Sequence, residues 1–305
     1  MKKESYRSNA ILLLTAFIWG SAFVAQRSSI NHIGPYLFNA MRFSLGSISL
    51  IPVWLILKKR TDSHPKNNLR ATLYYGFLAG AAIFLGASFQ QVGLMTTTAG
   101  KSGFITGLYV VIVPLINMLW GVYSGFNTWV GAIFSAIGLY FLCMTESLIL
   151  STGDFLTLLC AFFFAFHVIM ISSFSRKTDP ILLSMIQFAV CAILSFIIAI
   201  ISETIQMESI RRTALAICYC GFISVGIGYT LQVVGQKDAN PDHAAIILCL
   251  EGVFAAICGW IILYEQMSSR AIFGAALMLS GMIISQIGLN TKVIQLKTYL
   301  RQYND

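Results

Sequence analysis

Long apolar stretches, separated by short polar segments, follow one another along the whole chain of 305 residues. Each is close to the roughly 20 residues that a helix needs to cross a bilayer. A segment inside lipid must satisfy its own backbone hydrogen bonds, and the alternating pattern of a β-barrel is missing, so the stretches predict helices. We expect ten transmembrane helices, at residues 8–30, 36–57, 71–93, 98–122, 128–146, 152–173, 180–202, 212–235, 242–264 and 269–290.

The ten stretches form two sets of five with related sequences. Pro35 recurs as Pro180, 145 residues later, and Gly131 recurs as Gly274 after the spacing has shortened by two residues. An odd number of crossings inverts the second set relative to the first, so we predict an all-α integral membrane protein built from two inverted five-helix repeats. The predicted domains are these two repeats and a cytoplasmic tail: 8–146, 152–290 and 291–305.

Composition and charge favour the same class of protein. The chain is 57% hydrophobic and 10% charged, whereas about a quarter of the residues of a soluble domain are charged. The net charge of +8 does not predict a nucleic-acid partner, because fourteen lysines and arginines fall in segments on one side of the membrane and four on the other. By the positive-inside rule, this predicts a multi-pass protein of the cell membrane with both termini in the cytoplasm.

Glu251 is the first candidate for transport chemistry, because it lies near the middle of the ninth predicted span. An ionisable group at that depth is costly in a bilayer and points to function. The side chain suits proton coupling or the binding of a substrate amine. The alternative is a hydrogen-bonded anchor between helices.

Two cations also fall within predicted spans. Arg42 lies about seven residues into the second span, and Lys101 opens the fourth. Both lie toward the outer side, where together with Arg27 they would give a positive field that attracts anions. The alternatives are structural pairing or snorkelling for Arg42 and contact with lipid head groups for Lys101. The counterpart of Arg42 in the second repeat is Gln187, so the repeat does not require a cation there.

Further polar and aromatic residues lie inside the predicted spans. His167 lies in the middle of the sixth span and, since histidine titrates near neutral pH, it can share a proton path with the buried carboxylate or simply bond a neighbouring backbone group. Gln90 and Gln232, with Tyr229 one turn before Gln232, suit recognition of a zwitterion or a polar ring, or the linking of helices. Trp19 suits contact with an aromatic ligand or ordinary packing.

Several short segments resemble a known family when they are taken together. The first span contains FIWGSAF at 17–23, the second NAMRF at 39–43, and the ninth LEGVFAA at 250–256. The fourth begins TAGKSGF and continues GLYVVIVP, which includes Tyr109, a further candidate for substrate binding. With the duplication, these segments resemble EamA-type members of the drug/metabolite transporter superfamily over residues 10–290.

The resemblance implies a fold and a general activity. It implies ten helices, cytoplasmic termini, and a central cavity lined mainly by spans one, three, four, six, eight and nine. It also implies transport of amino acids, other metabolites, nucleotide derivatives or toxic compounds. One departure is Gly252, which stands where the family pattern usually places Pro after the ninth-span Glu. Both residue types loosen a helix, so a hinge remains the expectation there.

We therefore expect a secondary transporter that moves a small organic solute, such as an amino acid or related metabolite, by alternating access. Its energy source is proton coupling, exchange or facilitated diffusion. A multidrug exporter of the same fold is the alternative, and an intramembrane enzyme or a scaffold protein is the rival class. The chain has no HExxH, GxSxG or Walker sequence, so we expect no enzyme activity, cofactor or metal. The predicted partners are a small-molecule substrate, the lipid bilayer and protons, and a homodimer is left open.

Overall fold

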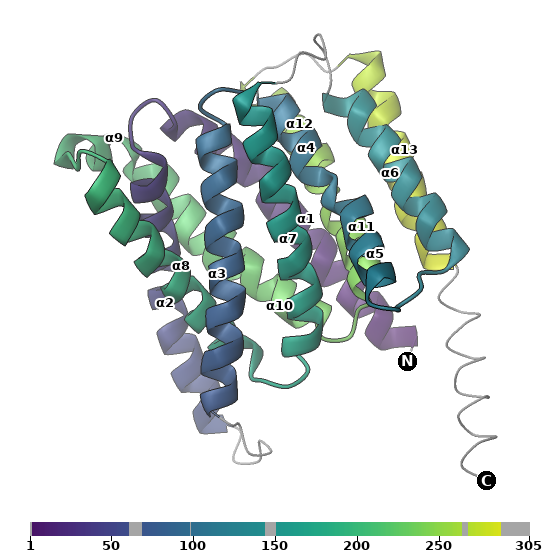
Figure 1. Ribbon diagram of the computed structural model, residues 1–305, viewed down its shortest axis with the longest axis horizontal. Coiled ribbons are helices and arrows are strands. Elements are labelled where there is room, and N and C mark those ends of the chain that lie inside the picture. The colour runs from purple at the N-terminus through teal and green to yellow at the C-terminus, as the bar shows by residue number, and fades with distance from the viewer. Residues whose placement is uncertain (1, 61–68, 98, 144–150, 264–267, 288–305) are drawn as a thin grey trace.

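The computed structural model describes residues 2–60, 69–97, 99–143, 151–263 and 268–287. All regular structure in these residues is helical (Figure 1). In chain order the helices are α1 (Lys2–Ser29), α2 (Pro35–Arg60), α3 (Leu69–Gly93), α4 (Ala99–Gly107), α5 (Tyr109–Leu119), α6 (Phe126–Cys143), α7 (Thr152–Phe174), α8 (Pro180–Ser202), α9 (Met207–Cys218), the π-helix η1 (Tyr219–Tyr229), α10 (Thr230–Gln236), α11 (Pro241–Leu248), α12 (Glu251–Leu263) and α13 (Ser269–Ile287).

The predicted number of membrane crossings agrees with this structure. In the part of the chain that the structure describes, eight helical stretches are long and apolar enough to cross a membrane. Two shorter apolar helices, at Phe126–Leu142 and Ser269–Ser285, lie where the fifth and tenth spans are predicted. The class prediction, an all-α multi-pass membrane protein, is therefore confirmed, and the two shorter helices fit the prediction of ten crossings. Several boundaries differ, most of all at α1, which begins at Lys2 rather than residue 8, and at the eighth span, which begins at Met207 rather than residue 212.

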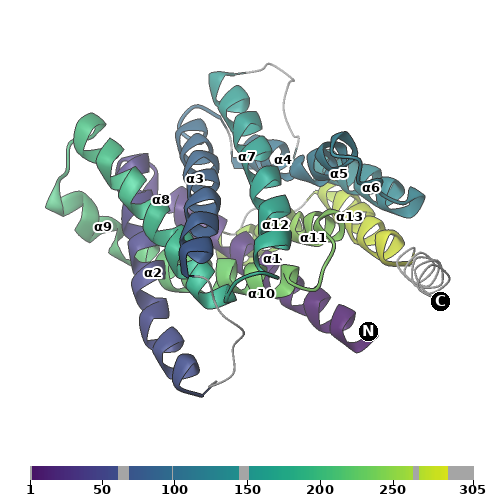
Figure 2. The ribbon, with the colours of Figure 1, turned by 60° about the horizontal axis from the view of Figure 1, so that its bottom comes forward.

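The helices pack in a few extensive pairs. α2 lies against α8, α3 contacts both α7 and α8, and α1 contacts α12. α6 and α13 form a pair at one edge of the molecule, while α2, α8 and α9 form the opposite edge, as both Figure 1 and Figure 2 show. The central helices α1, α7, α11 and α12 therefore lie between two outer layers.

The α6–α13 pair packs through glycine. A Cβ atom added to Gly138 would lie 2.6 Å from the Gly274 carbonyl oxygen, and one added to Gly131 would lie 2.6 Å from the Gly281 carbonyl oxygen. No side chain fits at such distances, so the two backbones are in direct contact. Six residues separate the two glycines in each helix, a spacing visible in the sequence, and the glycines pair crosswise, Gly131 with Gly281 and Gly138 with Gly274.

Two predicted spans are interrupted near their centres. The sequence predicted both as single helices without a break. The fourth span divides into α4 and α5 at Leu108, and the ninth divides into α11 and α12 at Cys249 and Leu250. Tighter hydrogen bonds between residues three apart mark both places, from Val111 N–H to the Leu108 carbonyl and from Gly252 N–H to the Cys249 carbonyl. The second break lies directly before the hinge expected at Gly252.

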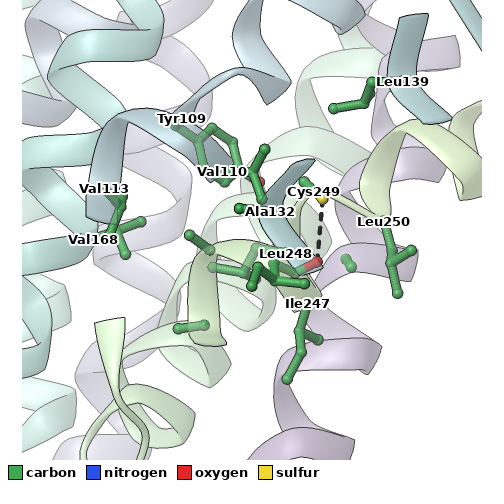
Figure 3. Packing of buried hydrophobic residues seen from close by; sticks show 14 of the residues in the cluster. Tyr109, Val110, Val113, Ala132, Leu139, Val168, Ile247, Leu248, Cys249 and Leu250 are labelled. Carbon is green, nitrogen blue, oxygen red and sulfur yellow. Dashed lines mark hydrogen bonds between the residues drawn. The ribbon is translucent and has the colours of Figure 1, made fainter. Parts of the chain in front are cut away.

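The two interruptions lie beside each other in the interior. Figure 3 shows Tyr109 and Val110, at the start of α5, next to Leu248, Cys249 and Leu250. These residues belong to one buried apolar cluster that also takes in residues of α1, α6, α7 and α13. Apolar packing thus holds two tightened helical turns at the centre of the protein.

Candidate functional site

A central cavity lies between the helices, on the side of the membrane where α1 ends. It contains about 550 Å³ of empty space, its opening included. Gln26 and Gln90 lie near the ends of α1 and α3, and Arg42 lies near the start of α2, so these lining residues share one side. The wall comes from spans one, three, four, six, eight and nine, as the family resemblance implies, and also from span two.

Eight of the nine candidate residues from the sequence line this cavity. They are Trp19, Arg42, Gln90, Tyr109, His167, Tyr229, Gln232 and Glu251. The backbone of Lys101 lies in α4, but its side chain is outside the described residues. Placement in one cavity makes these residues neighbours; that they bind a solute remains a prediction.

Glu251 and Tyr109 join the two interrupted helices across the cavity. Each is the first residue of its half-helix, α12 and α5 respectively. The Tyr109 hydroxyl donates a hydrogen bond to Glu251 Oε1 at 3.3 Å. A carboxylate at a helix N-terminus is also favoured by the helix dipole. The carboxyl group of Glu251 therefore lies where the two spans are interrupted. Its hydrogen-bond partner there is the Tyr109 hydroxyl.

Arg42 is a buried cation in the cavity wall. Its side chain is 3% exposed, and its Nη1 donates to Gln26 Oε1 at 3.0 Å. The guanidinium carbon lies 5.5 Å from the ring centre of Phe38 and 5.0 Å from that of Phe43. Among the described residues, its buried Nε atom has no hydrogen-bond partner. The guanidinium thus retains donor capacity inside the protein.

Aromatic rings cover the part of the wall near Glu251. The rings of Trp19 and Tyr229 lie with their centres 4.5 Å apart, and the Trp19 indole N–H donates to the Ser224 carbonyl at 3.3 Å. Ser224 lies in η1, where π-helical geometry changes the usual backbone bonding, and π-helical turns often mark functional sites. A Cβ atom at Gly228 would lie 2.9 Å from the indole nitrogen, so glycine lets the ring approach.

The remaining polar candidates bond to other residues of the wall or interior. His167 Nε2 is hydrogen-bonded to Gln187 Oε1 at 3.1 Å, and the described residues give no contact from His167 to Glu251. The predicted proton path between those two residues therefore has no direct link in this conformation. Gln90 donates to the Thr106 hydroxyl at 3.3 Å, while Gln232 Oε1 is buried without a partner among the described residues.

The opposite side of the protein is tied together by polar side chains. Asn117 and Ser124 both donate to the buried carboxylate of Asp242 at the start of α11. Arg176 donates to the backbone carbonyls of Lys237 and Ala239, at 2.9 Å and 3.2 Å. These bonds link the ends of spans four, six, eight and nine on the side where α1 begins.

Sequence reasoning missed six lining residues: Phe23, Gln26, Phe164, Val168, Ser224 and Leu248. A usable signal existed for two of them. Phe23 and Gln26 follow Trp19 by four and seven residues and therefore share its helix face. Ser224 contributes a backbone carbonyl, which no side-chain pattern reveals.

Comparisons with known proteins agree with this architecture. The EamA-like transporter family matches the chain twice, at residues 7–144 and 151–286. An uncharacterized transporter of Archaeoglobus fulgidus is 34% identical over 276 residues, which cover 90% of this chain and 83% of the relative. The uncharacterized transporter YoaV of Bacillus subtilis is 22% identical, with 90% and 94% covered. A solved structure described only as "Crystal structure of protein" has a TM-score of 0.77 at 17% identity, covering 92% of this chain and 98% of its own, and shows the fold alone.

Proposed function

Because the chain belongs to the EamA-like transporter family and is a multi-pass membrane transporter, we propose that it is a secondary carrier of a small organic solute, an amino acid or a related metabolite. The carrier works by alternating access across the cell membrane. The observation that carries the proposal is the central cavity, in which Glu251 and Arg42 face one space between two interrupted helices. Interrupted helices around a polar site near the membrane midplane are typical of secondary transporters.

The proposed mechanism uses two inverted repeats, at residues 8–146 and 152–290. Two observations support the repeats. The family matches once within each half. The helix contacts are also repeated between the halves. The third span (α3) contacts the seventh (α8), and the equivalent eighth span (η1) contacts the second (α2). Likewise the fourth span (α4 and α5) contacts the sixth (α7), and the equivalent ninth span (α12) contacts the first (α1). If the halves exchange conformations, the side tied by Asp242 opens and the cavity side closes.

Glu251 is the proposed coupling or amine-binding residue. It is partly exposed to the cavity, and its only hydrogen bond among the described residues comes from Tyr109. A carboxyl group that faces the transport site and lies at a helix break is placed to exchange a proton or bind an amine as the half-helices move.

The cytoplasmic placement of both termini is proposed from the charge distribution, and labelling of a cysteine at position 63 from the cytoplasmic side tests it.

Transport by the reconstituted protein tests the whole proposal. The purified protein is placed in liposomes, exposed to a mixed metabolite pool with and without a pH gradient, and the accumulated solutes are identified by mass spectrometry. Uptake only with the gradient supports proton coupling. Uptake independent of the gradient supports exchange or facilitated diffusion and assigns Glu251 to solute binding or structure. No uptake of any compound would contradict the proposal.

A multidrug exporter is the second candidate, favoured by the aromatic part of the wall around Trp19 and Tyr229. Hydrophobic cations added to the pool separate the two candidates. Accumulation of those cations in place of metabolites would favour the exporter.

A further inference from the structure

We propose that the carried solute is an elongated zwitterion, whose carboxylate binds Arg42 and Gln26 and whose amine binds Glu251. This inference rests on the proposed function and names its substrate class. It differs from a carrier of ordinary α-amino acids, which hold both charges on one carbon atom. Three features of the cavity support it: a cation without a counter-charge, an opposite charge at a distance, and an aromatic surface between them.

Arg42 needs an anion that the described part of the chain does not supply. The side chain is buried, and its one hydrogen bond goes to the neutral amide oxygen of Gln26. No carboxylate lies within ion-pair distance of it among the described residues. A buried charge without a counter-charge is strongly unfavourable. Because Arg42 also faces the cavity, a carboxylate entering the cavity satisfies it, through the paired donors of the guanidinium fork.

Glu251 supplies the opposite charge, but at another level of the cavity. A Cβ atom at Gly20 would lie 2.7 Å from the Glu251 carbonyl oxygen, so Glu251 lies beside Gly20 of α1. Arg42 is bonded to Gln26, six residues further along α1. At 1.5 Å per residue, the position of the Glu251 backbone and that of Gln26 are about 9 Å apart along α1. The Glu251 carboxylate accepts from Tyr109, and the Arg42 guanidinium donates to Gln26, so each charged group has its own partner.

The rings of Trp19 and Tyr229 line the cavity, and the fully buried ring of Phe43 packs behind that of Tyr229. Ring centres lie 5.9 Å apart between Phe43 and Tyr229, and 4.5 Å apart between Tyr229 and Trp19. Phe43 itself lies under the Arg42 guanidinium. An apolar surface with a cationic end and an acidic end fits a methylene chain that carries a carboxylate and an amine at its two ends.

Isomeric probes test the proposed charge spacing. Binding to the purified wild-type protein is measured by thermal stabilisation and by competition for uptake, with 4-aminobutanoate, 5-aminopentanoate, 6-aminohexanoate, 2-aminopentanoate and pentylamine. At least one of the three ω-amino acids is expected to bind about tenfold or more tightly than 2-aminopentanoate, since the α-amino isomer leaves one charged contact unmade. Equal or tighter binding of 2-aminopentanoate would overturn the inference.

Substitution of Arg42 tests which end binds the carboxylate. The Arg42→Gln protein is expected to lose its preference for 5-aminopentanoate over pentylamine, while Arg42→Lys retains part of it. Arg212→Gln, which changes an exposed cation of α9 that pairs with Glu208, is the matched control and keeps the wild-type preference. A preference that survives in Arg42→Gln would contradict the assignment. If that variant does not fold, the isomer comparison in the wild-type protein decides alone.

The two proposals fail in different ways. A wild-type protein that transports solutes from the mixed pool but does not prefer ω-amino acids overturns this inference and leaves the carrier function standing. A protein that transports nothing contradicts the carrier function, and the binding measurement then still decides the zwitterion site.

Discussion

The α6–α13 pair and the interrupted spans at the cavity show two opposite ways of packing helices. In α6–α13, two pairs of glycines bring two continuous backbones into contact. At the cavity, α4–α5 and α11–α12 break, and Tyr109 and Glu251 meet across the breaks through one hydrogen bond. The first arrangement leaves no room for a side chain between the backbones, while the second places two polar side chains on the cavity. The difference separates residues that stabilise the fold from residues that we propose for transport.

The largest expected effect comes from breaking the glycine contact. Gly138→Leu must place a side chain where a Cβ atom alone lies 2.6 Å from a backbone oxygen of α13. We expect a loss of about 3 kcal/mol in stability, at the upper end for overpacking, and a fall of several degrees in the unfolding temperature. Gly103→Leu is the control, because a Cβ atom there meets nothing within 4 Å among the described residues. Equal unfolding temperatures for the two variants would refute the contact.

The second largest effect is expected at the cavity, when the charge of Glu251 is removed. Glu251→Gln keeps the size of the side chain and removes its charge, so the fold should persist with an unfolding temperature close to the wild type. Transport driven by a pH gradient is expected to fall more than tenfold in liposomes. Glu208→Gln, at an exposed carboxylate paired with Arg212, serves as the control and leaves transport unchanged. Wild-type transport by Glu251→Gln would return this residue to a structural role.

A smaller loss is expected when only the bond between the two breaks is removed. Tyr109→Phe retains the ring in the buried cluster and deletes the hydroxyl that donates to Glu251. A single hydrogen bond contributes about 1 kcal/mol, which corresponds to roughly a fivefold decrease in transport. Uptake kinetics measure this, with Tyr123→Phe, at an exposed tyrosine, as the control. An unchanged uptake rate would show that the bond has no part in transport.

The smallest effect is expected at His167. Its ring is bonded to Gln187 and has no contact with Glu251 among the described residues. His167→Asn should therefore change uptake less than about threefold and leave its dependence on the pH gradient as in the wild type. A variant that folds but loses gradient dependence would place His167 on the proton path and contradict this interpretation.

Much of the fold follows from local sequence patterns. Apolar length predicts where helices cross, and equal glycine spacing in the fifth and tenth spans marks the residues that come into contact. Polar residues within spans also mark the site, because lipid exposure is costly and drives them to the interior. That is why Arg42, Gln90 and Glu251 could be named from the sequence and all line the cavity.

The missed features depend on backbone state or on helix ends. Gln26 lies near the end of its span, where a polar residue is ordinary and attracts no notice. Ser224 takes part through a carbonyl oxygen that accepts from Trp19 within a π-helix. The break at Leu108 and that at Cys249 and Leu250 fall on apolar residues, so hydropathy continues across them.

The amino-acid sequence by itself determined the membrane class, the number of crossings and the residue types inside the spans, because each depends on transfer of local segments into lipid. Only the tertiary structure decided the partners. It joined Arg42 to Gln26 and His167 to Gln187. It also set Glu251 beside Tyr109, 142 positions apart in the chain. Such pairs depend on how each helix is rotated and where it breaks, and those properties are set by the packing of all the helices together.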